Sequence, residues 1–131
     1  MKRIVVYRIL MVLYLIGVAV LCFANFNKVA TRSYEILGLP ADKVVHFLMF
    51  FPFAVLGMLS FRRVGVVRTL MLIVGLYLSG CLMAWGTEYV QGLLPYREMD
   101  MEDFRADRMG LAAGAVTAFL IRIFVKAPRN A

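Results

Sequence analysis

The chain has 131 residues, 63% of them hydrophobic, and a mean hydropathy of +0.81. Soluble domains hold about 45–50% apolar residues, so this composition excludes an ordinary soluble protein and leaves no room for a separate globular enzyme domain. The net charge is +7. On a chain this apolar, a positive charge indicates anionic lipid, and not nucleic acid, as the partner.

Four long apolar segments follow one another along the chain, at about 7–26, 43–61, 69–91 and 107–125. Each is close to the about 20 residues that a helix needs to cross the hydrocarbon core. The first segment follows Lys2 and Arg3, but it is longer than the apolar part of a signal peptide, so we interpret it as a retained helix. We therefore predict an all-α membrane protein, with four transmembrane helices in one small bundle and a single domain over residues 1–131.

The fourth segment carries small residues four apart, at Gly110, Gly114 and Ala118. Small residues at this spacing let another helix approach closely, so this face is predicted to be a packing seam. The two cysteines, Cys22 and Cys81, both fall inside apolar segments. We interpret them as small hydrophobic fillers, and they predict neither a disulfide nor a metal framework.

Basic residues are unevenly divided between the two sets of helix ends. One set has nine, with no acidic residue, and the other has six alongside all eight acids. The positive-inside rule counts Lys and Arg alone, so the contrast favours both termini in the cytoplasm. The nine basic residues are Lys2, Arg3, Arg8, Arg62, Arg63, Arg68, Arg122, Lys126 and Arg129, and the six are Lys28, Arg32, Lys43, Arg97, Arg105 and Arg108.

Unusual polar residues gather where the second helix begins, the third ends and the fourth begins, and the topology brings these three ends together. At the start of the second helix, Asp42 and His46 share a face beside Lys43. Asp42 is interpreted as a helix cap or dipole partner, and Lys43 as a snorkelling side chain. His46 lies about one turn inside a spanning helix, where an ionisable group marks a functional site or pairs with a polar partner.

The predicted partner of His46 is Glu88, which shares a face with Gln91 at the end of the third helix. These three side chains would form a polar pocket beneath the headgroups, or a buried network that only fixes helix packing. His46 and Glu88 are the catalytic candidates if the site is an enzyme. With one histidine and no second histidine ligand, a metal site of His46 and carboxylates is only weakly indicated, and none is predicted.

Arg97 lies in the next loop and is interpreted as an anion clamp or as a salt-bridge partner of nearby acids. Asp103 and Asp107 lie four apart at the start of the fourth helix, where negative charge complements the helix dipole. They repel each other unless a cation such as Lys43, Arg97 or a metal ion lies between them. These two aspartates are therefore the residues that a metal ion would use.

Four motifs in order resemble the VanZ-like family of membrane proteins: Asp-Lys-x-x-His-Phe at 42–47, Glu-x-x-Gln at 88–91, Pro-x-Arg at 95–97 and Asp-Phe-x-Ala-Asp at 103–107. The resemblance spans about residues 40–118. The family usually has Asn where this chain has Asp107. If the polar residues of the family are carried over to this chain, the resemblance implies that the site residues are Lys43, His46, Glu88, Gln91, Arg97 and Asp103. Asp107 is included provisionally, because it stands in the place of the family's Asn.

The resemblance implies a multi-pass protein of the bacterial cytoplasmic (inner) membrane that serves the cell envelope, since the namesake members are linked to teicoplanin susceptibility. Three functions stay open. The pocket could bind an anionic or polyprenyl-linked lipid headgroup, with Lys43 and Arg97 on phosphate; it could be an enzyme acting on a lipid phosphate; or it could be a structural subunit of a complex. The residues specify no cofactor, and they are compatible with homo- and hetero-oligomers.

Overall fold

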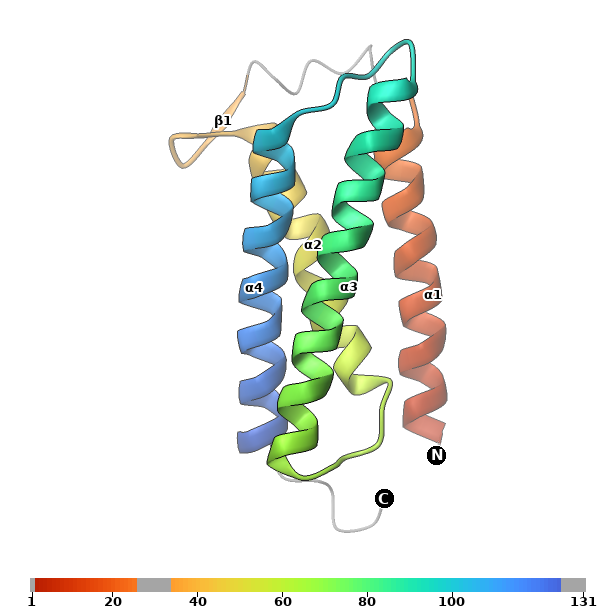
Figure 1. Ribbon diagram of the computed structural model, residues 1–131, viewed down its shortest axis with the longest axis vertical. Coiled ribbons are helices and arrows are strands. Elements are labelled where there is room, and N and C mark those ends of the chain that lie inside the picture. Colours follow the sequence, from red (N-terminus) through yellow and green to blue (C-terminus); the bar gives the residue numbers. More distant parts are fainter. Residues whose placement is uncertain (1, 26–33, 126–131) are drawn as a thin grey trace.

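The computed structural model describes residues 2–25 and 34–125, so the predictions on Lys28, Arg32, Lys126 and Arg129 lie outside the described residues. Within the described part, the fold is all-α, as predicted. An elongated bundle is formed by the helices α1 (Lys2–Phe23), α2 (Ala41–Leu59), α3 (Val66–Leu93) and α4 (Met101–Phe124) (Figure 1). The start of α1 and the end of α4 lie at the same end of the bundle (Figure 1).

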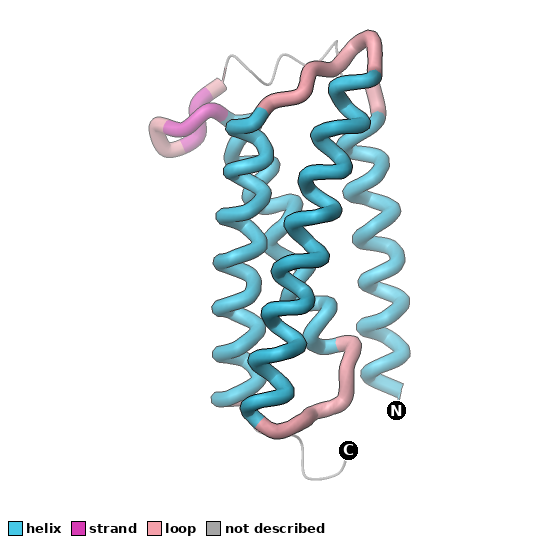
Figure 2. The backbone as a smooth tube through the Cα atoms, viewed as in Figure 1, coloured by secondary structure: helices cyan, strands magenta, loops and turns pink. Residues whose placement is uncertain are grey.

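The loops α2–α3 and α3–α4 lie at opposite ends of the bundle (Figure 2). A short antiparallel hairpin of β1 (Glu35–Ile36) and β2 (Leu39–Pro40) precedes α2. Its turn residues, Leu37 and Gly38, have φ of 55° and 76°, and positive values at both central positions are typical of a type I′ turn.

Three of the four helices, α1, α2 and α3, are long and apolar enough to cross a membrane. The apolar side chains of α1 and α3 mostly point outward, since 6% and 11% of their most apolar stretches are buried within the bundle, against 39% for α2. An outward apolar surface of this extent fits lipid and not water as the surrounding medium. The first two turns of α4 instead carry charge, at Glu102, Asp103, Arg105, Asp107 and Arg108, and Arg122 lies near its other end.

The fourth helix begins at Met101, not at about 107 as predicted. Asp100 is its N-cap and accepts a hydrogen bond from the backbone N–H of Glu102 at 2.8 Å. Glu102 and Asp103 then place negative charge in the first turn, where the helix dipole favours it. The apolar pattern misses these turns because they are helical without being hydrophobic. The first helix begins at Lys2 and ends at Phe23, and the third extends beyond its predicted range at both ends.

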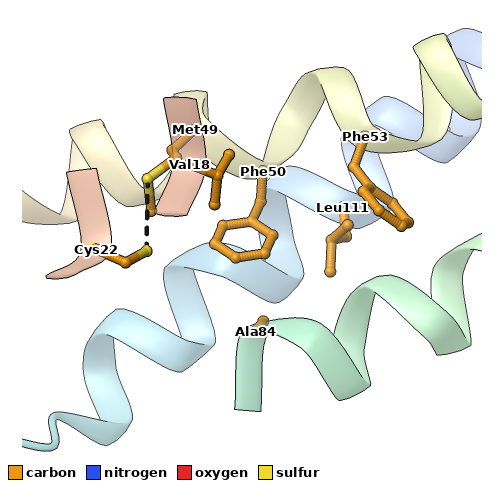
Figure 3. Close-up of a cluster of buried hydrophobic side chains, with 7 residues drawn as sticks. All are labelled: Val18, Cys22, Met49, Phe50, Phe53, Ala84 and Leu111. Carbon is orange, nitrogen blue, oxygen red and sulfur yellow. Dashed lines mark hydrogen bonds between the residues drawn. The ribbon is translucent and has the colours of Figure 1, made fainter. Parts of the chain in front are cut away.

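A cluster of buried side chains from all four helices forms the apolar core (Figure 3). Phe50 of α2 lies at its centre and is completely buried, with Val18 and Cys22 of α1 on one side and Leu111 of α4 on the other. The Cys22 sulfur lies 4.0 Å from that of Met49. Cys22 belongs to this buried cluster and Cys81 packs against it half-buried, as expected of small apolar residues.

The predicted seam on α4 is confirmed, and its partner is α2. Gly110, Gly114 and Ala118 are all buried. A Cβ atom added at Gly110 would overlap the carbonyl oxygen of Phe47, and one added at Gly114 would overlap that of Phe51. Because the obstacle at both positions is backbone, only glycine allows the two helices this approach. The seam therefore fixes α4 against α2 directly below the polar residues.

Candidate functional site

Ionisable side chains from three helix ends meet at one end of the bundle, as the sequence predicted. Lys43 and His46 come from the first two turns of α2, and Glu88 comes from near the end of α3. Asp103 and Asp107 come from the first two turns of α4. The up-and-down order of the helices brings these ends together (Figure 1). The resulting network has an exposed half and a buried half.

The exposed half is centred on the ammonium group of Lys43, and we call it the outer cluster: Asp42, Lys43, Asp100 and Asp103. The Lys43 Nζ atom lies 2.6 Å from Asp100 Oδ2 and 3.3 Å from Asp42 Oδ2, and it also donates to Asp103 Oδ1. The side chains of Lys43 and Asp100 are 23% and 34% exposed. The outer cluster therefore pairs one cation with three carboxylates in a place that an external group can reach.

The buried half consists of His46, Glu88 and Asp107, which we call the inner triad. His46 Nδ1 lies 2.8 Å from Asp107 Oδ1 and 3.9 Å from Glu88 Oε1. The side chains of Glu88 and Asp107 are 1% and 0% exposed. Glu88 is thus confirmed as a neighbour of His46, but Asp107 is the closer partner. From the sequence, Asp107 was expected near Asp103, and its contact with His46 was not predicted.

Two contacts connect the inner triad to the outer cluster. His46 Nε2 lies 3.4 Å from Asp103 Oδ2, and the backbone N–H of Asp100 donates to Glu88 Oε2 at 3.1 Å. The imidazole ring of His46 therefore lies between Asp103 and Asp107, the two aspartates that were expected to need a cation between them. Lys43 neutralises Asp103 from the other side.

Gln91 and Arg97 were predicted to belong to the same pocket, but the structure shows both side chains donating hydrogen bonds to carbonyl groups at the end of α1. Gln91 Nε2 donates to the carbonyl of Cys22 at 2.8 Å, and Arg97 Nη2 donates to the carbonyls of Leu21 and Ala24 at 2.9 and 3.3 Å. The last carbonyls of a helix have no partner within that helix. Gln91 and Arg97 therefore satisfy the end of α1 and hold it against α3.

Two residues of the outer cluster depart from the predictions: Asp42 has another role than the one predicted, and Asp100 was not predicted at all. Asp42 does not cap α2: Pro40 occupies the N-cap position without a side-chain hydrogen bond, and Asp42 lies in the first turn. Its carboxylate pairs with Lys43 there, and its charge still complements the helix dipole. Asp100 was not a predicted site residue. An aspartate directly before a helix is typical of an N-cap, and this signal could have placed it at the start of α4.

Among the described residues, two groups of side chains bring potential metal ligands within 4.8 Å of one another: the inner triad, and the three carboxylates Asp42, Asp100 and Asp103. The second group already surrounds the ammonium group of Lys43. The inner triad combines an imidazole with two carboxylates, which can hold a proton or a metal ion.

Comparison with protein families gives a match to the VanZ/LLP1 family over residues 11–122, which is most of the chain. The chain belongs to the VanZ/LLP1 family. The match confirms the resemblance seen in the motifs, and it extends beyond residues 40–118 to include most of α1. No curated protein and no solved structure matches the chain.

In this VanZ/LLP1 protein, the four motifs that carry the resemblance divide between two structural tasks. The motifs at 42–47 and 103–107 supply Lys43, His46, Asp103 and Asp107 to the network. The motif at 95–97 supplies Arg97 to the end of α1, and the motif at 88–91 serves both places through Glu88 and Gln91. In this chain, the residues of the four motifs therefore serve the packing of α1 as well as the polar network.

Proposed function

We propose that this VanZ/LLP1 protein binds the headgroup of an anionic envelope lipid, or of a lipid-linked cell-wall precursor, as a binding or accessory module. The observation that carries the proposal is the outer cluster. It is a partly exposed group of one lysine and three carboxylates, located at the end of a bundle whose sides are apolar. In a membrane, the end of such a bundle lies at the depth of the lipid headgroups.

The outer cluster offers one ammonium group for a phosphate oxygen and three carboxylates for hydroxyl groups, so it suits a headgroup in which hydroxyl groups outnumber phosphate. A phosphate oxygen can replace a carboxylate at the Lys43 ammonium group, because both are anionic acceptors. The carboxylates of Asp42 and Asp100 can then accept hydrogen bonds from sugar hydroxyls. A phosphate-linked sugar on a polyprenyl chain presents both kinds of group, and its chain can lie along the outward apolar surfaces of the helices.

For this function we propose that all four helices span a bacterial inner membrane, with both termini in the cytoplasm. The α4 helix has 24 residues, enough to cross the hydrocarbon core, and its charged first turns would lie among the headgroups. The excess of Lys and Arg at the opposite end supports this orientation. The headgroup site would then face outward, toward the cell envelope. This location is consistent with a role in the envelope, to which the teicoplanin susceptibility linked to the namesake members is related.

Binding can be tested on the purified chain in nanodiscs, with a short-chain polyprenyl phosphate and its sugar-linked form as probes. Lys43→Met should weaken binding of both probes at least about tenfold, since a charge-assisted contact is lost. Arg68→Met is the matched control, because it removes the same charge from an exposed position at the opposite end of the bundle. Equal affinities for the wild type and Lys43→Met would contradict the proposal.

A second function, an enzyme acting on a lipid phosphate, is favoured by one observation. His46 Nδ1 lies 2.8 Å from Asp107 Oδ1, and a carboxylate at this distance orients an imidazole for acid–base chemistry. If the chain is an enzyme, the purified protein should release phosphate or transfer the headgroup, and this turnover should be lost in His46→Gln. Saturable binding without turnover would support the binding module instead.

A further inference from the structure

The inner triad holds two carboxylates in the interior of the bundle, with less hydrogen bonding than buried carboxylates require. Glu88 Oε1 and Asp107 Oδ2 are buried and have no hydrogen-bond partner in the part of the chain that the structure describes. Burial of a charged group is costly unless it is paired and hydrogen-bonded. His46 can supply one positive charge at most, so the two carboxylates together need a further cation or a proton.

The three side chains converge on a common point. Asp107 Oδ1 and Glu88 Oε1 both face His46 Nδ1, at 2.8 and 3.9 Å, and one ligand atom from each residue lies within 4.8 Å of the others. Two ligand atoms on the same metal ion are at most about 4.4 Å apart, because each lies about 2.0–2.2 Å from the ion. In tetrahedral geometry the ligand atoms lie about 3.5 Å from one another, so movements of about 1 Å, within reach of side-chain rotation, would bring the three onto one ion.

From this geometry we propose that the inner triad is a binding site for one divalent transition-metal cation, with His46 Nδ1, Glu88 and Asp107 as its ligands. The three ligands come from α2, α3 and α4, so the ion would join three helices at their polar end. The site lies in the interior, separate from the exposed surface that would receive a headgroup. It therefore holds whether or not a lipid binds to the outer cluster.

The surroundings support two of the three ligands, His46 and Glu88, in the way that a metal site requires. A histidine that binds a metal through one ring nitrogen donates the other N–H to a carboxylate, and Asp103 Oδ2 lies 3.4 Å from His46 Nε2. Lys43 in turn holds Asp103. Glu88 Oε2 accepts from the backbone N–H of Asp100, which leaves Oε1 facing the imidazole. The ring and the Glu88 carboxylate are thus oriented by neighbours outside the triad, whereas the Asp107 carboxylate contacts His46 itself.

The donor set indicates which cations would bind. Imidazole nitrogen suits Zn²⁺ and other transition metals, whereas carboxylate oxygen also suits Mn²⁺, Mg²⁺ and Ca²⁺. Ca²⁺ requires six to eight oxygen ligands and Mg²⁺ a nearly complete shell of oxygens, and neither requirement is met by two carboxylates and a nitrogen. We therefore expect Zn²⁺ or Mn²⁺ to bind more tightly than Mg²⁺ or Ca²⁺.

The test uses the full chain, purified in detergent, stripped with a chelator and reloaded with ZnCl₂ or MnCl₂. After desalting, elemental analysis should find about one ion per chain in the wild type. Asp107→Asn and Glu88→Gln should each lower the affinity at least about tenfold, because each removes an anionic ligand with little change of shape. Glu102→Gln is the matched control, because its exposed carboxylate lies on α4 in an ion pair with Arg105.

Thermal unfolding separates a metal site from a purely structural network. Added Zn²⁺ or Mn²⁺ should raise the unfolding temperature of the wild type and of Glu102→Gln, because the ion binds the folded state alone, and should leave that of Asp107→Asn unchanged. Should Asp107→Asn fail to fold, the visible absorption of Co²⁺ added to the wild type and to His46→Gln decides the question: a ligand-field band in the wild type alone supports the site. Metal retention well below one ion per chain, or equal retention by the wild type and Asp107→Asn, would overturn the proposal.

Discussion

Lys43 has three ionic partners, because three carboxylates surround its ammonium group. Its four-carbon stem brings the charge from the first turn of α2 to the first turn of α4. The side chain is 23% exposed, so water screens these pairs only in part. Lys43 therefore has a structural task in addition to its proposed contact with phosphate.

Lys43→Met should lower the free energy of unfolding by about 1–3 kcal/mol, because three carboxylates lose their common cation. Thermal unfolding in detergent measures the change. Arg105→Met removes one member of the exposed pair with Glu102 and should stay within about 0.5 kcal/mol of the wild type. If the two variants unfold at the same temperature, the outer cluster does not stabilise the bundle.

Gln91 shows how a motif residue can belong to packing and not to the site. It is 3% exposed, and its amide donates to the carbonyl of Cys22 at the end of α1. Loss of this donor leaves a buried carbonyl without that partner, which is costly.

Gln91→Leu is therefore expected to destabilise the fold by about 1–3 kcal/mol while the folded fraction binds the polyprenyl phosphate probe with the affinity of the wild type. Unfolding curves and binding titrations on the same preparation give both values. Normal stability with weakened binding would show that Gln91 belongs to the binding site, as predicted from the motif at 88–91.

Among the elements, α2 and α4 form the closest pair. Gly110 and Gly114 of α4 lie against the backbone carbonyls of Phe47 and Phe51, so the helices meet without intervening side chains. This contact lies near Asp107 and fixes the register in which α4 presents its aspartates to His46. A side chain at the seam would move α4 away from α2 and separate these partners.

Gly114→Ala should destabilise the bundle by about 1–3 kcal/mol or more, because the added methyl group meets backbone that cannot rotate away. Gly17→Ala is the control within α1, where an added Cβ meets nothing within 4 Å, and its stability should be unchanged or slightly higher. Both are measured by thermal unfolding in detergent. Equal stabilities of the two variants would show that α4 does not depend on this approach.

For the whole molecule, charge distribution and helix order together define two different ends. The network lies at one end, and the opposite end carries basic residues such as Arg62 and Arg63 in the α2–α3 loop. There Arg122 donates to the carbonyls of Met58 and Phe61, and Arg63 donates to those of Arg122 and Val125. These arginines satisfy helix ends with positive charge, which the helix dipole favours.

Orientation in the membrane can be measured with single cysteines in a variant that lacks Cys22 and Cys81. Both Glu98 and Arg62 are exposed, at opposite ends of the bundle. In spheroplasts of a bacterial host, an impermeant maleimide should label Glu98→Cys directly and Arg62→Cys only after permeabilisation. The reverse pattern would place the network in the cytoplasmic leaflet and the termini outside.

Apolar segment lengths were enough to predict an all-α membrane protein with four helices, because the bilayer demands about 20 apolar residues wherever a helix crosses it. Motif order was enough to indicate the family, and helix order was enough to bring three polar ends together. The start of α4 was missed because it is determined by the N-cap Asp100 and by acidic residues that complement the helix dipole, and not by hydrophobicity.

Only the tertiary structure decided which polar residues are partners. Sequence spacing shows which side chains share a face of one helix, but it does not give the rotation and height of one helix relative to another. The α2–α4 seam sets both, and for this reason His46 pairs most closely with Asp107 and not with Glu88. The position of α1, which the spacing of polar residues does not reveal, directs Gln91 and Arg97 to its carbonyls. The sequence thus determined the membrane fold and the end of the bundle that carries the polar residues, and packing decided how they are connected.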